Sequence, residues 1–158
     1  MAFLLTKAPI APDFELVSHC GAAIRLLNTH NGLTLLIFIR GHWCPYCRRY
    51  LKKLQANAAR FVERNVRLLV ISPEPAATSR ALAAEIGASF PILFDPDGAV
   101  IDRFGIRNGP IASKIVLPYP AVFLIDAHGA IVFRRIDRNF KRRTTMHTLF
   151  TAINSASL

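Results

Sequence analysis

Residues 34–50 read Thr-Leu-Leu-Ile-Phe-Ile-Arg-Gly-His-Trp-Cys-Pro-Tyr-Cys-Arg-Arg-Tyr, and this stretch decides the fold that we expect. It begins with a short apolar run between turn-forming neighbours, which predicts a buried strand. A helical pattern begins near Cys44, so Cys44 and Cys47 lie on one face at the start of a helix, close enough for a disulfide. The helix N-terminus carries partial positive charge, which lowers the pKa of a thiol. The stretch therefore predicts a site of thiol chemistry.

Length and composition favour one compact domain. The chain has 158 residues, of which 52% are hydrophobic and 19% are charged, a composition typical of a globular protein with a substantial core. We expect a single domain over residues 1–158. Residues 1–7 lack the basic leader and the apolar length of a signal peptide, and no stretch is long enough to span a membrane. We therefore expect a cytoplasmic protein with no membrane partner.

The charge is strongly basic. Twenty Lys and Arg residues against 10 Asp and Glu residues give a net charge of +10, which would attract nucleic acid, anionic lipid or acidic proteins. No nucleic-acid-binding motif accompanies the charge, so we do not expect a nucleic-acid partner. The basic stretch from Arg134 to Arg143 is open to two interpretations, a docking site for an acidic partner or solvated charge before a helix. We favour solvated charge.

Cysteine usage separates redox chemistry from metal binding. The chain has 3 cysteines, too few for a secreted disulfide scaffold, and a close pair in a reducing compartment favours redox or metal chemistry. A zinc ion would need two more ligands, and His19 with Cys20 is the obvious source. No second Cys-x-x-Cys or spaced histidine pair is present in the sequence. We therefore favour a redox pair with no metal and no cofactor.

The remaining patterns predict an α/β fold with a mixed sheet covered on both faces. Short alternating segments around Gly21 predict a peripheral hairpin, and one helix should run over residues 44–63. The apolar face of that helix is expected to consist of Cys47, Tyr50, Leu51, Leu54, Ala58, Phe61 and Val62. Further strands are expected over 33–39, 66–71, 90–94, 120–126 and 131–136. Further helices are expected from Thr78 or Ser79 to Ile86, over 99–104, and after a cap at Thr144 or Thr145, with a loop over 106–118. Parallel strand–helix–strand units followed by an antiparallel hairpin make the sheet mixed.

Four stretches make the chain resemble a known superfamily. They are residues 11–16 (Ala-Pro-Asp-Phe-Glu-Leu), 40–47 (Arg-Gly-His-Trp-Cys-Pro-Tyr-Cys), 90–98 (Phe-Pro-Ile-Leu-Phe-Asp-Pro-Asp-Gly) and 120–126 (Pro-Ala-Val-Phe-Leu-Ile-Asp). In this order they resemble the thioredoxin superfamily, and more narrowly its peroxiredoxin-like branch, the alkyl hydroperoxide reductase/thiol-specific antioxidant family. The resemblance implies a thioredoxin-like fold with the N-terminal hairpin as an extension.

The resemblance also implies a function. It implies a thiol-dependent oxidoreductase that cycles Cys44 and Cys47 between dithiol and disulfide and reduces hydroperoxides in an antioxidant role. A thiol reductant such as a thioredoxin or glutathione system would complete the cycle. Substrate would meet Trp43, Pro45 and Pro120, and the resemblance implies a cis peptide bond before Pro120. The alternatives are an oxidoreductase for protein disulfides, and a non-enzymatic basic binding protein whose cysteine pair is structural or binds metal.

The sequence departs from both parent patterns. Peroxiredoxins carry Pro-x-x-x-Thr/Ser-x-x-Cys, and aligning its cysteine with Cys47 puts Arg40 at the proline and Cys44 at the hydroxyl residue. The peroxide-polarising arginine of that family falls at Pro120, and the buried acid of thioredoxins falls at Phe38. Neither set of proton and charge partners is complete, which leaves the oxidant open between a peroxide and a disulfide.

Two assignments of the attacking thiol follow. The helix start and the greater exposure expected there favour Cys44 as nucleophile, with Cys47 resolving the intermediate. The peroxiredoxin register instead favours Cys47 as the attacking thiol. Arg40, His42 and Arg48 add positive charge that should favour the thiolate. We favour Cys44, and we expect His42 either to tune the pair or to be a surface residue.

Overall fold

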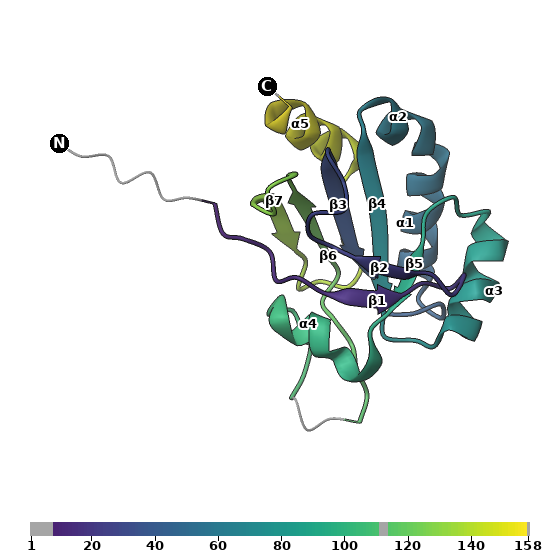
Figure 1. Ribbon diagram of the computed structural model, residues 1–158. Helices are drawn as coiled ribbons and strands as arrows, with labels where there is room; N and C mark the ends of the chain where they lie inside the picture. Colours follow the sequence, from purple (N-terminus) through teal and green to yellow (C-terminus); the bar gives the residue numbers. More distant parts are fainter. Residues whose placement is uncertain (1–7, 111–113, 158) are drawn as a thin grey trace.

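The computed structural model describes residues 8–110 and 114–157, and this part of the chain forms a five-stranded sheet with helices around it and a separate hairpin (Figure 1). The strands are β1 (Glu15–Val17), β2 (Ala23–Arg25), β3 (Leu33–Phe38), β4 (Val66–Ser72), β5 (Ile92–Phe94), β6 (Ala121–Ile125) and β7 (Ile131–Ile136). The helices are α1 (Pro45–Ala56), α2 (Ala58–Glu63), α3 (Ala76–Ile86), α4 (Ala99–Arg103) and α5 (Met146–Ala156), with a 3₁₀ turn, η1, at Pro96–Gly98. The expected α/β class and the N-terminal hairpin are confirmed.

The strand order places β3 at the centre of the sheet. The order is β5-β4-β3-β6-β7, with β3 parallel to β4 and antiparallel to β6. The β4–β5 pair is parallel and the β6–β7 pair is antiparallel, so the sheet is mixed, as expected. Because β3 has a neighbour on each side, the loop that follows it begins from a rigid, fully paired strand. That loop leads directly to the cysteine pair.

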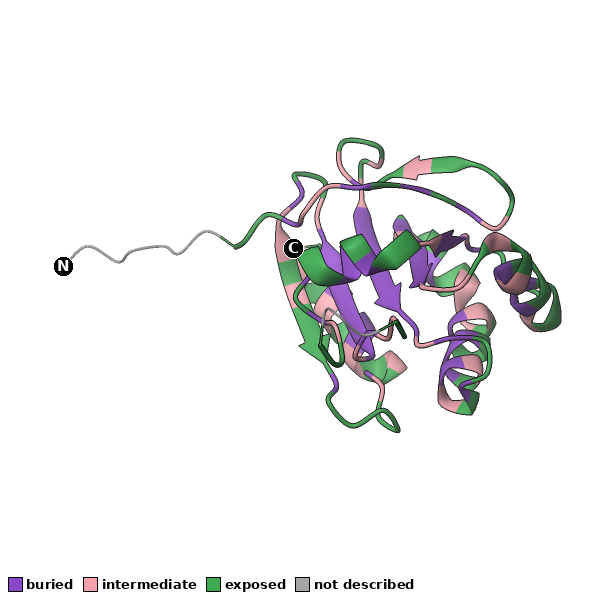
Figure 2. Cartoon of the chain, turned by 90° about the horizontal axis from the view of Figure 1, so that it is seen from below, coloured by how far each residue is buried: buried purple, intermediate pink, exposed green. Residues whose placement is uncertain are grey.

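Both faces of the sheet are covered, and β3 is buried along its whole length. Alternate side chains of a strand point to opposite faces. Leu35 and Ile37 accordingly join a core shared with α1, α3 and α5, while Leu36 and Phe38 join a second core shared with α4 and the β1–β2 hairpin. Figure 2 shows the buried strands enclosed by helices whose outer faces are exposed. The cysteine pair belongs to the first core.

The expected continuous helix over 44–63 is interrupted. Asn57 leaves the helical conformation, with φ −104° and ψ 10°, and its side-chain amide donates to the carbonyl of Lys53 at 2.8 Å. Asparagine side chains compete for backbone hydrogen bonds in this way, which disfavours them inside helices. After the break Phe61 is buried, whereas Val62 is 75% exposed. Our assignment of Val62 to the apolar face was therefore wrong.

Two helix starts differ in how well local sequence predicted them. Helix α3 begins at Ala76, earlier than Thr78 or Ser79, and the side chain of Ser79 is buried in the structure and caps nothing. Helix α5 begins as expected, because the Thr145 hydroxyl accepts the N–H of Thr148 at 3.1 Å.

None of the described helices has the length and apolar character needed to cross a bilayer.

The bond before Pro120 is trans, because no cis peptide bond occurs among the described residues. Our expectation of a cis bond was wrong. The approach to β6 is held by backbone pairing, in which Tyr119 N–H donates to the Ile106 carbonyl at 2.7 Å and the Pro120 carbonyl accepts from Asp137 N–H at 2.8 Å. The trans form of an X–Pro bond is intrinsically favoured by about 0.5–1 kcal/mol, and this pairing is satisfied with it.

Candidate thiol site

The cysteine pair lies at the start of α1, directly after the loop that follows β3. Cys44 is the N-cap residue, with an extended backbone at φ −85° and ψ 111°, and Pro45 occupies the first helical turn, where a missing N–H costs no helical hydrogen bond. Cys47 follows one turn inside. The side chains of both are free thiols, and they are 1% and 0% exposed. Exposure therefore does not distinguish the two thiols, contrary to our expectation for Cys44.

Two arginines surround the sulfur atoms. The Nη2 atom of Arg143 lies 3.1 Å from Cys47 Sγ and 3.9 Å from Cys44 Sγ. The Nη1 atom of Arg40 lies 3.9 Å from Cys44 Sγ, and the backbone N–H of Arg40 points to Cys47 Sγ at 3.4 Å. All of these groups are donors, and two carry full positive charge. The site is thus arranged to stabilise negative charge on sulfur.

The two thiols differ in acidity. Burial opposes ionisation of Cys44, but hydrogen bonds from the backbone N–H and the thiol of Cys47, the charge of Arg143 and a hydrogen bond from Arg40 lower the pKa of Cys44 below that of an ordinary thiol. Burial raises the pKa of Cys47, and the neighbouring Cys44 adds to that effect. Cys44 is therefore the more acidic of the two thiols. In a dithiol whose two thiols differ in acidity, the more acidic thiol is suited to attack the substrate and the other to resolve the intermediate.

Aromatic rings fix the arginine that reaches Cys44. The Arg40 guanidinium lies 4.9 Å from the Trp43 ring centroid and 4.8 Å from that of Phe140. Both rings are partly exposed, at 50% and 42%. Cation–π contacts of this kind restrict a guanidinium without neutralising it. Trp43 and Phe140 thus hold a positive charge beside a buried thiol.

A groove of 470 Å³ opens beside Trp43. Its lining comes from the loop before Cys44, the β4–α3 connection, the β5–η1 region and the segment before β6: Arg40, Trp43, Pro73, Glu74, Pro75, Phe94, Pro96, Asp97, Lys114, Ile115, Val116 and Leu117. Pro45 is exposed on the first turn of α1, and Pro120 is buried just before β6. Of the three residues we predicted for substrate contact, the structure places Trp43 on the groove.

His42 pairs with a carboxylate. Its backbone N–H donates to Glu74 Oε1 at 2.5 Å, and its ring Nδ1 lies 2.5 Å from Glu74 Oε2. The imidazole is exposed, as one of our two interpretations held. This double contact ties the loop before Cys44 to the β4–α3 connection. A second ion pair, between Arg48 and Glu85, joins α1 to α3.

His19 and Cys20, which we considered as further zinc ligands, do not join the cysteine pair in a cluster. Cys20 is exposed, and the ring Nδ1 of His19 accepts the N–H of Ile92 at 3.0 Å. Within residues 8–110 and 114–157, no three side chains of the His, Cys, Asp and Glu types gather in a way that could hold a metal ion. His19 is thus engaged in joining the hairpin to β5.

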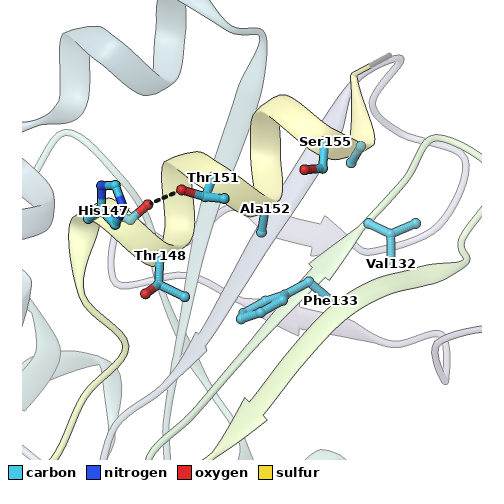
Figure 3. A pocket seen from close by; sticks show the side chains of 8 residues that line it. Val132, Phe133, His147, Thr148, Thr151, Ala152 and Ser155 are labelled. Atoms are coloured by element: carbon cyan, nitrogen blue, oxygen red, sulfur yellow. Dashed lines mark hydrogen bonds between the residues drawn. The ribbon is translucent and has the colours of Figure 1, made fainter.

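A hollow of 650 Å³ lies between β7 and α5, away from the cysteines (Figure 3). Its lining is mostly apolar and hydroxyl-bearing: Val132, Phe133, His147, Thr148, Thr151, Ala152, Ser155 and Ala156. The Thr151 hydroxyl donates to the carbonyl of His147 at 2.9 Å and is thereby satisfied within the helix. No cysteine borders this hollow, so its size alone does not connect it with thiol chemistry.

Arg143 is the residue that sequence reasoning missed. It lies in the basic stretch that we interpreted as solvated charge, yet its guanidinium contacts both sulfur atoms. The cluster of basic residues just before a predicted helix cap was the available signal. Nothing in the local pattern indicated which of them would turn inward.

Together the fold and the site define a class of protein: a thioredoxin-fold protein with a Cys-x-x-Cys pair at the start of the first long helix. The model of the AhpC/TSA family matches residues 8–134, and the chain belongs to that family. This confirms the resemblance seen in the sequence.

Similar proteins fall into two groups. The chain is 32% identical over 123 residues to the thiol-disulfide oxidoreductase ResA of Halalkalibacterium halodurans, covering 77% of this chain and 64% of that one. It is 28% identical over 135 residues to alkyl hydroperoxide reductase E of Mycobacterium tuberculosis, covering 82% and 84%. The chain therefore spans less than two thirds of the length of the ResA relative.

Solved structures agree on the fold. Peroxidoxin BcpB from Mycobacterium tuberculosis superimposes with a TM-score of 0.79 at 22% identity, covering 94% of both chains. Peroxiredoxin Q from Xanthomonas campestris superimposes with a TM-score of 0.80 at 17% identity, covering 92% of both. The thioredoxin-like fold that we expected is thus confirmed.

Proposed function

We propose that the protein is a thiol-dependent oxidoreductase that cycles Cys44 and Cys47 between dithiol and disulfide and reduces hydroperoxides. The observation that carries the proposal is the difference in acidity between the two thiols beside Arg143. The pKa of Cys44 is lowered and that of Cys47 is raised. Membership of the AhpC/TSA family and the similarity to an alkyl hydroperoxide reductase support a peroxide as the oxidant.

The proposed cycle begins at Cys44. Its thiolate attacks the terminal oxygen of the hydroperoxide, the O–O bond breaks, and an alcohol leaves after taking up a proton, so that Cys44 becomes a sulfenic acid. The sulfur of Cys47 then attacks Cys44 Sγ, forming the disulfide and releasing water. A thiol reductant, from a thioredoxin or glutathione system, returns two electrons by thiol–disulfide exchange.

Arginine supports both halves of this sequence. Arg143 contacts both sulfurs, and Arg40 contacts Cys44, so each thiolate in turn has a cation beside it. A guanidinium in this place also polarises an incoming peroxide oxygen, the role that the family assigns to an arginine and that Pro120 does not fill here. We propose that Trp43 and Pro45 flank the approach to Cys44 and that Pro120 shapes its floor.

A second candidate is the reduction of protein disulfides. The groove beside Trp43 and the similarity to ResA, itself a thiol-disulfide oxidoreductase, favour an extended chain as substrate. The same Cys44 thiolate would attack a substrate sulfur, and Cys47 would release the mixed disulfide. A non-enzymatic binding role, our remaining alternative, does not explain why the two thiols of the pair differ in acidity.

The location also belongs to the proposal. The chain has 3 cysteines, too few for a secreted disulfide scaffold. We therefore propose the cytoplasm, together with a cytoplasmic thiol reductant. Fractionation with an antibody against the native protein would test this directly.

Steady-state turnover of hydrogen peroxide and of insulin disulfides, with dithiothreitol or a thioredoxin system as reductant, distinguishes the candidates. Hydroperoxide reduction predicts that the peroxide rate exceeds the disulfide rate by about tenfold or more, a difference of 1.4 kcal/mol in barrier. Cys44→Ser should abolish both activities. In the absence of a small-molecule thiol, Cys47→Ser should stop after one turnover of peroxide, leaving a sulfenic acid on Cys44 that dimedone traps.

Cys20→Ser provides the matched control, because it removes an exposed thiol that is not part of the pair. Its turnover should equal that of the wild type. Full activity in Cys44→Ser would refute the proposal, and a faster insulin rate than peroxide rate would select the disulfide candidate.

A further inference from the structure

A third cavity, of 320 Å³, lies next to the thiol pair, between α1 and the connection from β7 to α5. Helix α1 contributes Tyr46, Arg49, Tyr50 and Lys53, and the other wall contributes Arg135, Lys141, Arg142 and Arg143. Six of these eight side chains are cationic, and none is acidic. The cavity is therefore a concentrated region of positive potential.

Two residues that line this cavity each carry a donor atom without a hydrogen-bond partner among the described residues. The side chain of Tyr50 is buried, with the residue 4% exposed, and its hydroxyl has no hydrogen-bond partner in the structure. The Nε atom of Arg143 is also buried without a partner. Burial raises the pKa of Tyr50, so the hydroxyl keeps its proton and remains a donor at neutral pH. A buried donor without an acceptor costs about 1–3 kcal/mol.

The charges within the cavity are mostly uncompensated. Asp137 lies 3.3 Å from Arg135 Nε and neutralises that side chain. Arg143 uses Nη1 on the carbonyls of Phe140 at 2.5 Å and Arg142 at 2.7 Å, which orients its guanidinium without neutralising it. Like charges gathered in this way repel one another, and an anion among them would remove the repulsion.

We propose that this cavity binds an oxyanion (a carboxylate, phosphate or sulfate group) on a small molecule, and that the bound anion is coupled to the thiol pair through Arg143. Arg49, Lys53, Lys141 and Arg143 line the cavity and supply the positive charge. At roughly 30 Å³ per water molecule, the volume holds about ten waters, the size of a small metabolite and not of a polymer. The proposal rests on the proposed function only in regarding the thiol pair as reactive.

The coupling follows from a shared guanidinium. Arg143 contacts the sulfurs through Nη2, and the same residue lines the cavity. An anion beside this guanidinium competes with the Cys44 thiolate for the same delocalised charge. Occupancy should therefore make the Cys44 thiolate less favourable and slow its reaction with electrophiles. Removal of the anion should restore that reactivity.

Inorganic phosphate, titrated against chloride at constant ionic strength near pH 7, tests both parts. Two readouts are needed: the thermal unfolding midpoint, and the rate of Cys44 alkylation by neutral iodoacetamide, followed by peptide mass spectrometry so that Cys20 does not interfere. Phosphate should raise the midpoint through binding to the native state. It should also slow Cys44 alkylation severalfold. Neither readout requires turnover, so a failed peroxidase assay leaves this test intact.

The double variant Lys53→Gln with Lys141→Gln removes two cavity charges that do not touch sulfur. It should lose both phosphate effects. Lys52→Gln with Arg134→Gln removes the same charge from exposed positions outside the cavity and should keep both. Equal loss in the two double variants, or no effect of phosphate beyond that of chloride, would refute the site. A raised midpoint with unchanged alkylation would refute the coupling through Arg143.

The source of the oxyanion is distinguished by two small thiols of nearly equal size, 3-mercaptopropionate and 3-mercaptopropionamide, as reductants of the Cys44–Cys47 disulfide. If the wild type reacts faster with 3-mercaptopropionate than with the amide, and the double variant Lys53→Gln with Lys141→Gln loses this preference, the oxyanion belongs to the reductant. Equal rates, with phosphate effects present, would identify a free anion as the ligand.

Discussion

Arg143 Nη2 lies 3.1 Å from Cys47 Sγ although 96 positions separate the two residues in sequence. The cysteine comes from the first long helix and the arginine from the connection before the last one. This contact brings a fixed positive charge to a dithiol that lacks the acid of one parent family and the hydroxyl residue and proline of the other. Several properties of the pair should depend on it.

Arg143→Gln should raise the pKa of Cys44, because it removes one of the charges that lower it. A rise of one pKa unit corresponds to about 1.4 kcal/mol and to about a tenfold slower alkylation at a pH below the pKa. The pH dependence of iodoacetamide labelling measures it. Arg134→Gln, an equal charge change at an exposed position on β7, should leave the profile unchanged. An unchanged profile in Arg143→Gln would show that the guanidinium does not govern the thiol.

The same variant should make the disulfide a weaker oxidant. Positive charge stabilises the thiolate, and therefore the reduced form, more than the disulfide. Its loss should move the reduction potential to more negative values, by about 30 mV for each 1.4 kcal/mol. Equilibration with glutathione redox buffers measures the potential, and the single Trp43 provides a fluorescence signal beside the pair. A shift in the positive direction would contradict the assignment.

Gly41→Ala should disturb the loop that leads to Cys44. An added Cβ would collide with the Trp43 indole and come within 3.0 Å of Glu74 Oε1. Relief of such overlaps usually costs about 1–3 kcal/mol of stability. We expect a lower free energy of unfolding in urea and a shifted Trp43 emission maximum. Gly87→Ala, where a Cβ meets no atom within 4 Å, provides a contrast in which only the left-handed backbone is strained. Its Trp43 emission should be that of the wild type.

Asp13 should stabilise the N-terminal hairpin in a pH-dependent way. Its carboxylate accepts the N–H groups of Phe14 and Leu27 at 2.9 and 3.0 Å and pairs with Arg25 at 2.7 Å. Burial raises the pKa of Asp13, but these partners outweigh burial and lower it below 3.8. Because the folded pKa is depressed, the contribution is complete well above pH 3.8 and is lost as the pH falls through the folded value.

Asp13→Ala should therefore destabilise the protein by about 1–3 kcal/mol at pH 7. The difference from the wild type should shrink as the pH falls below 4. Urea unfolding at several pH values measures both effects. Glu15→Gln, at an exposed position in β1, should give little change at any pH. A constant difference between pH 7 and pH 3 would mean that Asp13 acts without its charge.

Local patterns predicted most of the fold because they report local forces. The apolar run of β3, the hairpin around Gly21, the strand over residues 131–136 and the Thr145 cap all depend on periodicity or on contacts within a few residues. The break at Asn57 and the exposure of Val62 were missed, because one asparagine redirected the helix that followed it. That residues 1–158 make one domain stays a prediction, as do the roles of the site residues.

The sequence by itself determined that the chain carries a Cys-x-x-Cys pair between a buried strand and a helix, and its resemblance to a known family implied that the sheet is thioredoxin-like. A strand period and a helix start are local properties, and they can be recognised without knowing the rest of the molecule. Only the tertiary structure decided that Arg143 reaches the sulfurs, that Cys44 is as buried as Cys47, and that the bond before Pro120 is trans. These features depend on how distant segments pack against one another, and the direction of a long, flexible side chain follows from that packing.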